Sequence, residues 1–444
     1  MKNSIRLSDH FTYKKLLRFT VPSIVMMVFT SIYGVVDGFF ISNFSGKTAF
    51  AAVNFIIPFV FVLGTVGFMF GTGGSAVVAK TLGQGEKKKA NELFSLFVYV
   101  AFIIGILISL LGLLFLRPVT SFLGAEGELL EECVRYGRII IAANPAFVLQ
   151  MLFQSFFIAA EKPKLGLYST VLAGCTNMVL DALLVAVFPL GVTGAALATG
   201  ISQIVGGVFP IIYFSLPNTS LFRLGKTHWD GRAVWKTCTN GSSELMSNIS
   251  MNLVSILYNI QLLKFAGEDG VSAYGVLMYV GFIFVAIFIG FSIGSAPVIS
   301  FHFGAENHNE LKSLLKKSCI FIAWTSLGMF IISQLLAVPL SSLFVGYDKA
   351  LLEMTVRGFR FNAFSFLFSG FAIFSSGFFT ALNDGVTSAL ISFLRTMLFQ
   401  IASVMLLPLV FRLDGIWSSL IVSEAMSVIL ALIFLVKKRD YYHY

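Results

Sequence analysis

Residues 165–203, LGLYSTVLAGCTNMVLDALLVAVFPLGVTGAALATGISQ, decide the fold of this chain. The stretch contains two apolar runs of helix length joined at Pro189, and it carries Asn177, Asp181 and Thr199 inside what should be hydrocarbon. A carboxylate at membrane depth is costly unless it is protonated, paired or hydrated. Asp181 is therefore the first candidate for a functional residue.

These three polar residues should lie close together. Asn177 and Asp181 are four residues apart, so their side chains share one face of a helix. With a rise of ~1.5 Å per residue, Asp181 lies roughly 10 Å from the Pro189 turn and Thr199, on the next helix, roughly 13 Å from it. We therefore expect all three to meet at one depth, where they could share one ligand.

The composition is that of an integral membrane protein. Of the 444 residues, 57% are hydrophobic and 12% are charged, whereas an average soluble domain is about 25% charged. The net charge of +9 does not indicate nucleic-acid binding, because Lys and Arg occupy the short gaps between apolar runs. The four cysteines are far apart and match no metal-binding spacing, so we predict neither a metal site nor disulfides.

Twelve apolar runs are long enough to cross ~30 Å of hydrocarbon. They cover residues 16–42, 50–81, 92–116, 131–160, 165–188, 191–215, 235–264, 271–302, 313–337, 351–382, 387–411 and 415–436. An even number of spans puts both termini on one side, and that side holds about 21 of the 31 Lys and Arg. We predict an all-α, multi-pass protein of the plasma membrane with both termini in the cytoplasm.

The longest gap between spans divides the chain into two lobes. It covers residues 217–234, follows the sixth span and contains several charged side chains. We predict an N-terminal lobe at 1–216, a cytoplasmic linker at 217–234 and a C-terminal lobe at 235–444.

The two lobes also resemble each other in sequence. GSA at 74–76 recurs at 294–296, and VRYGR at 134–138 recurs as VRGFR at 356–360. Six spans are an even number, so the repeats run in the same direction, an arrangement that usually encloses a central cavity. We predict twelve transmembrane helices in two pseudo-symmetric six-helix lobes around such a cavity.

A second acid, Asp37, lies near the outer end of the first span. Helix rise places it roughly 28 Å from the inner edge of its span and Asp181 roughly 24 Å, so the two share one depth. Two neighbouring carboxyl groups in a low dielectric cannot both ionise cheaply unless a cation bridges them. We predict an H⁺ or Na⁺ site formed by Asp37, Asn177, Asp181 and Thr199. The alternatives are a hydrated vestibule for Asp37 and interhelical hydrogen bonds for Asn177 and Thr199.

Three charges lie near the midplane of the C-terminal lobe: Glu244, Arg395 and Glu424. Buried charges normally pair, so we expect Arg395 to pair with Glu244 or with Glu424 and to hold the lobe together. The alternative is that an unpaired glutamate contacts the substrate.

Enzymes and ATP-driven pumps are excluded by missing motifs. The sequence contains no GxxxxGKS or GxxxxGKT phosphate loop, no HExxH and no GxSxG, so we expect no enzyme and no cofactor besides a coupling ion. The 48 Phe and 14 Met would suit a cavity for bulky organic cations. The expected partners are such cations and the lipid bilayer, not nucleic acid, with a monomer as the functional unit.

Several separated segments resemble the multidrug and toxic compound extrusion (MATE) family. They are VDGFFISNFSGKTAFAAVNFIIPF, GTGGSAVVAKTLGQGEKKKAN, NMVLDALLVAVFPLGVTGAALATGISQ, LLKFAGEDGVSAYGV and IGFSIGSAPVISFHFGAEN. The resemblance covers essentially the whole chain. It implies a secondary exporter with two six-helix lobes that moves organic cations outward against entry of H⁺ or Na⁺.

The resemblance also implies which acids couple transport. In the branch with its acidic site in the N-terminal lobe, the matching positions are Asp37, Asn177, Asp181 and Thr199. Other branches use acids of the C-terminal lobe, and Glu244 could match their glutamate. Their companion aspartate on the tenth span is missing, because residues 357–382 contain no acid. The N-terminal site is therefore favoured.

Two other functions stay open from the residues. A flippase for lipid-linked precursors could have a similar two-lobe architecture, but it would line its cavity with several cationic residues, and only Arg395 is clearly intramembrane. A channel or receptor needs no titrating acid pair.

Overall fold

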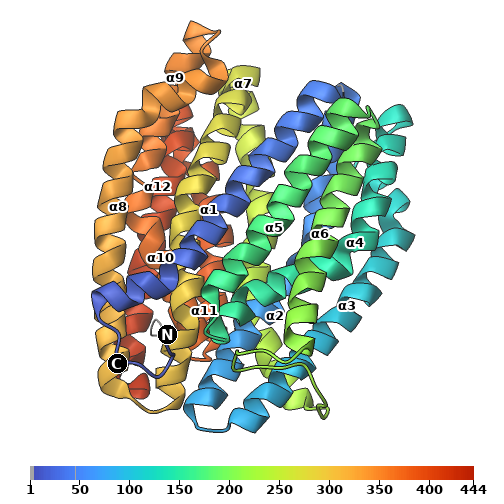
Figure 1. Cartoon of the computed structure of the whole chain (residues 1–444). Coiled ribbons are helices and arrows are strands. Elements are labelled where there is room, and N and C mark those ends of the chain that lie inside the picture. Colours follow the sequence, from blue (N-terminus) through green and yellow to red (C-terminus); the bar gives the residue numbers. More distant parts are fainter. Residues whose placement is uncertain (1–4, 46) are drawn as a thin grey trace.

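The computed structural model describes residues 5–45 and 47–444, and this part of the chain consists of helices and short connections (Figure 1). The elements are α1 (Tyr13–Phe44), α2 (Lys47–Gly83), α3 (Lys87–Phe122), α4 (Gly127–Ala159), α5 (Pro163–Asp181), η1 (Ala182–Val187), α6 (Gly191–Ser215), α7 (Gly231–Gly304), α8 (His308–Val345), α9 (Lys349–Ala363), α10 (Phe366–Ala381), α11 (Gly385–Phe393), η2 (Leu394–Phe399) and α12 (Gln400–Tyr442). The all-α class predicted from the sequence is confirmed.

The described helices account for twelve membrane spans. Nine helical stretches are long and apolar enough to cross a membrane within the described residues, and the bent pair α9 and α10 makes a tenth. Two of the nine contain a break, at Gly267 in α7 and at Arg412 in α12, where φ is positive. Each break divides its stretch into two spans. Both breaks fall in gaps that the hydropathy pattern predicts, and Gly267 adopts a φ of 63° that glycine tolerates easily.

The tenth predicted span, 351–382, is formed by two helices. It is bent by 48° between α9 and α10. The hydroxyl of Ser365 donates a 2.7 Å hydrogen bond to the carbonyl oxygen of Asn362, which satisfies an acceptor at the bend. No proline or glycine occupies this point, so the sequence carries no strong signal for the bend.

The two lobes, α1–α6 and α7–α12, contact each other mainly at the end that carries both chain termini (Figure 1). We call this the terminal end. A β-carbon added at Gly83 of α2 would overlap the carbonyl oxygen of Phe301 of α7, and one added at Gly290 would lie 2.5 Å from the Cα of Ile24 in α1. Gly38, in the outer half of α1, has no such neighbour within 4 Å. The lobes are thus closed together at the terminal end and apart at the other.

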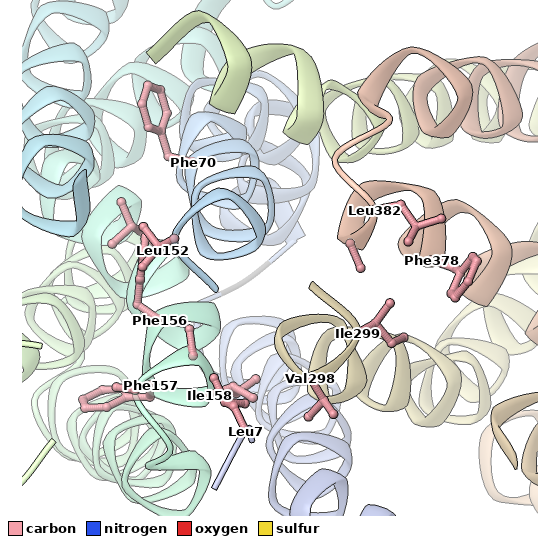
Figure 2. Close-up of a cluster of buried hydrophobic side chains, with 14 of the residues drawn as sticks. Leu7, Phe70, Leu152, Phe156, Phe157, Ile158, Val298, Ile299, Phe378 and Leu382 are labelled. Atoms are coloured by element: carbon pink, nitrogen blue, oxygen red, sulfur yellow. The ribbon is translucent and has the colours of Figure 1, made fainter. Parts of the chain in front are cut away.

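One buried apolar cluster joins the lobes at the terminal end (Figure 2). It contains Phe156 and Ile158 of α4 together with Val298 and Phe378 of the C-terminal lobe. Leu7, which precedes α1, lies beside Ile158 and Val298 in Figure 2. This packing is continuous across the two lobes and marks no boundary between them. The lobe limits at 1–216 and 235–444 therefore stay predictions.

Candidate cation-coupling site

Three helices bring the predicted N-terminal residues together. Asp37 lies on α1, Asn177 and Asp181 lie on α5, and Thr199 lies on α6. The side-chain amide of Asn177 donates a 3.4 Å hydrogen bond to the Thr199 hydroxyl. The Asp37 carboxyl group is close enough to all three other side chains to interact with them. The common depth expected from helix rise therefore corresponds to a real cluster.

This cluster is rich in acceptors and poor in donors. Asp181 has no exposed surface and Asn177 is 2% exposed. Both carboxylate oxygens of Asp181, one of Asp37 and the amide oxygen of Asn177 are buried without a donor among the described residues. An ionised carboxyl only accepts hydrogen bonds, so two facing carboxyls need a proton or a cation between them. No described Lys, Arg or His forms an ion pair with either aspartate.

The backbone is irregular next to Asp181. The α-helix α5 ends at Asp181, and the π-helical turn η1 follows it where the sequence predicts one helix to residue 188. A π-helical turn widens the helix and is frequent at functional sites. It returns to α6 through Gly191, whose φ is 58°. The chain thus changes its helical geometry at the buried acid itself.

Two tyrosines that the sequence analysis did not select also belong to the site. Tyr136 of α4 is 3% exposed, and its hydroxyl is close enough to Thr199, Asp37 and Asp181 to interact with all three. Tyr33 of α1, one helical turn before Asp37, feels the Asp37 charge. A signal for Tyr136 existed: in the repeated motif VRYGR, the second copy has Gly358 at its position. The tyrosine is therefore particular to the lobe that carries the acids.

The C-terminal charges are arranged differently. Arg395 Nε donates to Glu424 Oε1 at 3.1 Å and to Oε2 at 2.9 Å, and Nη2 donates to Oε1 at 2.8 Å. Glu424 is 2% exposed. Glu244 also feels the charge of Arg395 but lies beyond ion-pair distance of any described cation. Of the two predicted pairs, the structure forms the one with Glu424.

The chain is similar in sequence to known multidrug export proteins over almost its whole length. The chain is 23% identical to the multidrug export protein MepA of Staphylococcus aureus (strain MRSA252) over 436 residues, which is 96% of this chain and 94% of that protein.

The fold matches solved structures over almost the whole chain. A multidrug resistance MATE family transporter of the MOP superfamily in an outward-facing conformation gives a TM-score of 0.93 at 19% identity, with 100% of this chain and 99% of that chain covered. A MOP superfamily transporter from Pyrococcus furiosus, whose binding pocket is described as having reverse polarity, gives 0.91 at 19% identity and 98% coverage of both chains.

The profile of the MatE family matches twice, at residues 22–183 and 245–406. The two matches correspond to the two halves of the internal repeat, and together they cover more than half of the chain. The chain therefore belongs to the MatE family.

Proposed function

We propose that this protein is a multidrug efflux transporter, a secondary antiporter that exports organic, mostly cationic compounds against entry of H⁺ or Na⁺. The observation that carries the proposal is the pair of neighbouring carboxyls, fully buried Asp181 and partly buried Asp37, which have no ion-pair partner among the described residues. Such a pair gains a proton or a cation far more readily than an ordinary surface acid pair. It acts by alternating access in the plasma membrane, as a monomer, with both termini in the cytoplasm.

The arrangement of the lobes supports the direction of the cycle. They are in contact at the terminal end and apart at the other, where Asp37 lies near the end of α1. The coupling ion enters from that open side, where Asn177 and Thr199 add two oxygen atoms to those of the acids. Neutralising the acids removes their mutual repulsion and lets the outer half of α1 pack differently around Gly34 and Gly38, which have no neighbour within 4 Å of an added β-carbon. The cationic substrate is released as the ion binds.

The site chemistry suits both ions. Two carboxylates, an amide oxygen and a hydroxyl are hard oxygen ligands of the kind that Na⁺ takes, and the same carboxyls can share one proton. Tyr136 adds a further hydroxyl beside Thr199. The site needs no cofactor.

A lipid-linked precursor flippase is the less favoured function. It would need several free cations to hold a pyrophosphate, but Arg395 is held by both oxygens of Glu424. The name of the MepA relatives, multidrug export protein, also favours efflux of small molecules.

The test is efflux of a fluorescent organic cation from proteoliposomes. Each vesicle population receives an imposed pH gradient, a Na⁺ gradient or neither. We expect efflux under one of the two gradients and little without any. Efflux that ignores both gradients, or no efflux at all, would overturn the proposal, and transfer of a lipid-linked sugar in the same vesicles would replace it by the flippase.

A further inference from the structure

We propose that residues 5–12, the terminal strap, latch the two lobes together at the terminal end, and that Glu310 holds the bond that must release before the protein opens on that side. The inference rests on the alternating access proposed above. It concerns contacts at the far end of the molecule from the acid site.

The strap begins on the N-terminal lobe. The backbone N–H of Leu7 donates a 2.7 Å hydrogen bond to Glu161 Oε1, in the turn between α4 and α5. The strap is also tied to itself, because Asp9 accepts from the Arg6 N–H at 3.0 Å and pairs with Lys15 at 2.8 Å. These contacts give the strap a defined shape before it crosses to the other lobe.

The strap ends on the C-terminal lobe. The backbone N–H of Phe11 donates a 2.8 Å hydrogen bond to Glu310 Oε1, and His10 Nδ1 lies 2.6 Å from Glu310 Oε2. The carbonyl oxygen of Phe11 accepts from Lys317, which lies two helical turns further along α8. The Phe11 ring packs edge-on against His302 of α7. Both backbone polar groups of Phe11 are thus bound by α8.

Apolar burial reinforces these bonds. Leu7 and Phe11 have no exposed surface, and Leu7 lies beside Ile158 of one lobe and Val298 of the other (Figure 2). Residues 7–11 therefore bridge the lobes by backbone hydrogen bonds at both ends and by a buried side chain between them. The lobes cannot separate at this end while both anchors hold, because five residues of chain leave little slack.

Glu310 is the anchor that separation must break. The strap continues directly into α1 of the N-terminal lobe, so it moves with that lobe unless α1 itself unfolds. Glu310 is 6% exposed, and both of its oxygens are used by the strap. Hydrogen bonds to a charged group are among the stronger ones in proteins.

Cysteine alkylation of the purified protein tests the latch without any substrate or gradient. In a background with the four native cysteines replaced by alanine, one reporter is Thr237→Cys, a position with no exposed surface that lies against Gly73 across the lobe interface. A second reporter is Ser326→Cys, which is 2% exposed on α8 and measures general loosening of the fold.

We expect Glu310→Ala to raise the alkylation rate at Thr237→Cys roughly tenfold, since it removes two bonds to a charged acceptor. The rate at Ser326→Cys should not change. Glu306→Gln is the control, because Glu306 is an exposed glutamate in the connection just before α8. If Glu310→Ala fails to fold, Glu310→Gln keeps the side-chain shape and should give a smaller rise at the same reporter.

Three results would overturn the latch: an unchanged rate at Thr237→Cys, an equal rise at both reporters, or an equal rise with Glu306→Gln. Export by the same variants is measured separately. Opening at Thr237→Cys on loss of Glu310, together with a wild-type protein that exports nothing, would keep the latch and refute the exporter.

Discussion

Both lobes carry acids within their membrane spans, but only the C-terminal lobe pairs one of its acids, Glu424, with a basic side chain. In the C-terminal lobe, Glu424 is held by three hydrogen bonds from Arg395. In the N-terminal lobe, Asp37 and Asp181 face each other, with no ion-pair partner among the described residues. A paired charge needs nothing further, whereas an unpaired acid pair calls for a mobile proton or cation.

The difference between the two lobes indicates a structural role for the acid that has a basic partner and a transport role for the acids that have none. The repeat places similar helices in both lobes, so packing alone does not explain why the acids differ. The ion pair of Arg395 and Glu424 joins η2 to α12 and stabilises one arrangement. The acid pair has two protonation or cation-bound states, and a group with two states is what a transport cycle can use.

The largest expected effect comes from breaking the acid pair. Asp181→Asn should lower gradient-driven export about tenfold to a hundredfold, because the coupling ion then loses its differential affinity for the two states. Asp37→Asn should give a similar loss, and the double variant little more, since the two act as one site. The measurement is vesicle efflux at fixed gradient. The control is Asp269→Asn, which changes an exposed aspartate at the break in α7. Full activity in Asp181→Asn would refute the coupling role of the acid pair.

Breaking the ion pair should affect stability more than coupling. Arg395→Met leaves Glu424 buried without a partner, and we expect it to lower the free energy of unfolding by about 3–5 kcal/mol. Adding Glu424→Leu should restore most of that loss. Thermal unfolding in detergent measures both. The exposed pair of Arg357 and Asp414 is the matched control, and Arg357→Met should cost less than about 1 kcal/mol.

Tyr136 extends the coupling site of the N-terminal lobe beyond the acids. Tyr136→Phe removes one hydroxyl beside Thr199 and should lower export about threefold to tenfold, the effect of one hydrogen bond. Because the hydroxyl acts through the coupling site, the half-maximal H⁺ or Na⁺ concentration should also shift. Tyr168→Phe changes an exposed tyrosine of α5 and should leave both quantities unchanged. A lower rate with no shift would make Tyr136 a packing residue only.

The smallest effect is expected at a paired acid outside the membrane. Burial raises the pKa of Asp384, but hydrogen bonds from Lys438 and Thr387 outweigh burial and lower it below the ordinary 3.8. A lowered pKa stabilises the fold above the ordinary value, and this contribution disappears as the pH falls through the lowered pKa.

Asp384→Asn should therefore reduce stability by about 1 kcal/mol at neutral pH, because asparagine can still cap α11 but cannot pair with Lys438. The difference from the wild type should shrink as the pH falls below about 4. Thermal unfolding across this pH range measures it. A difference that stays constant with pH would show that the charge of Asp384 is not what stabilises α11.

The site could be predicted only in part from the sequence. Asp37 and Asp181 are visible because an acid inside an apolar run is rare, and Asn177 because it lies four residues from Asp181. Tyr136 was missed because a tyrosine in a membrane helix is ordinary, and its absence from the second copy of the repeat does not by itself show that it lies beside the acids. The π-helical turn after Asp181 has no sequence signature that we could have used.

The number of spans, the repeat and the expected depth of each acid follow from the sequence alone, because helix rise and apolar run length are local properties. Only the tertiary structure decided that Arg395 binds Glu424 rather than Glu244, that Tyr136 faces Thr199, and that the strap joins Glu161 to Glu310. Those choices depend on how each helix is rotated and packed against its neighbours. Such contacts join residues far apart in the chain, and no local pattern encodes them.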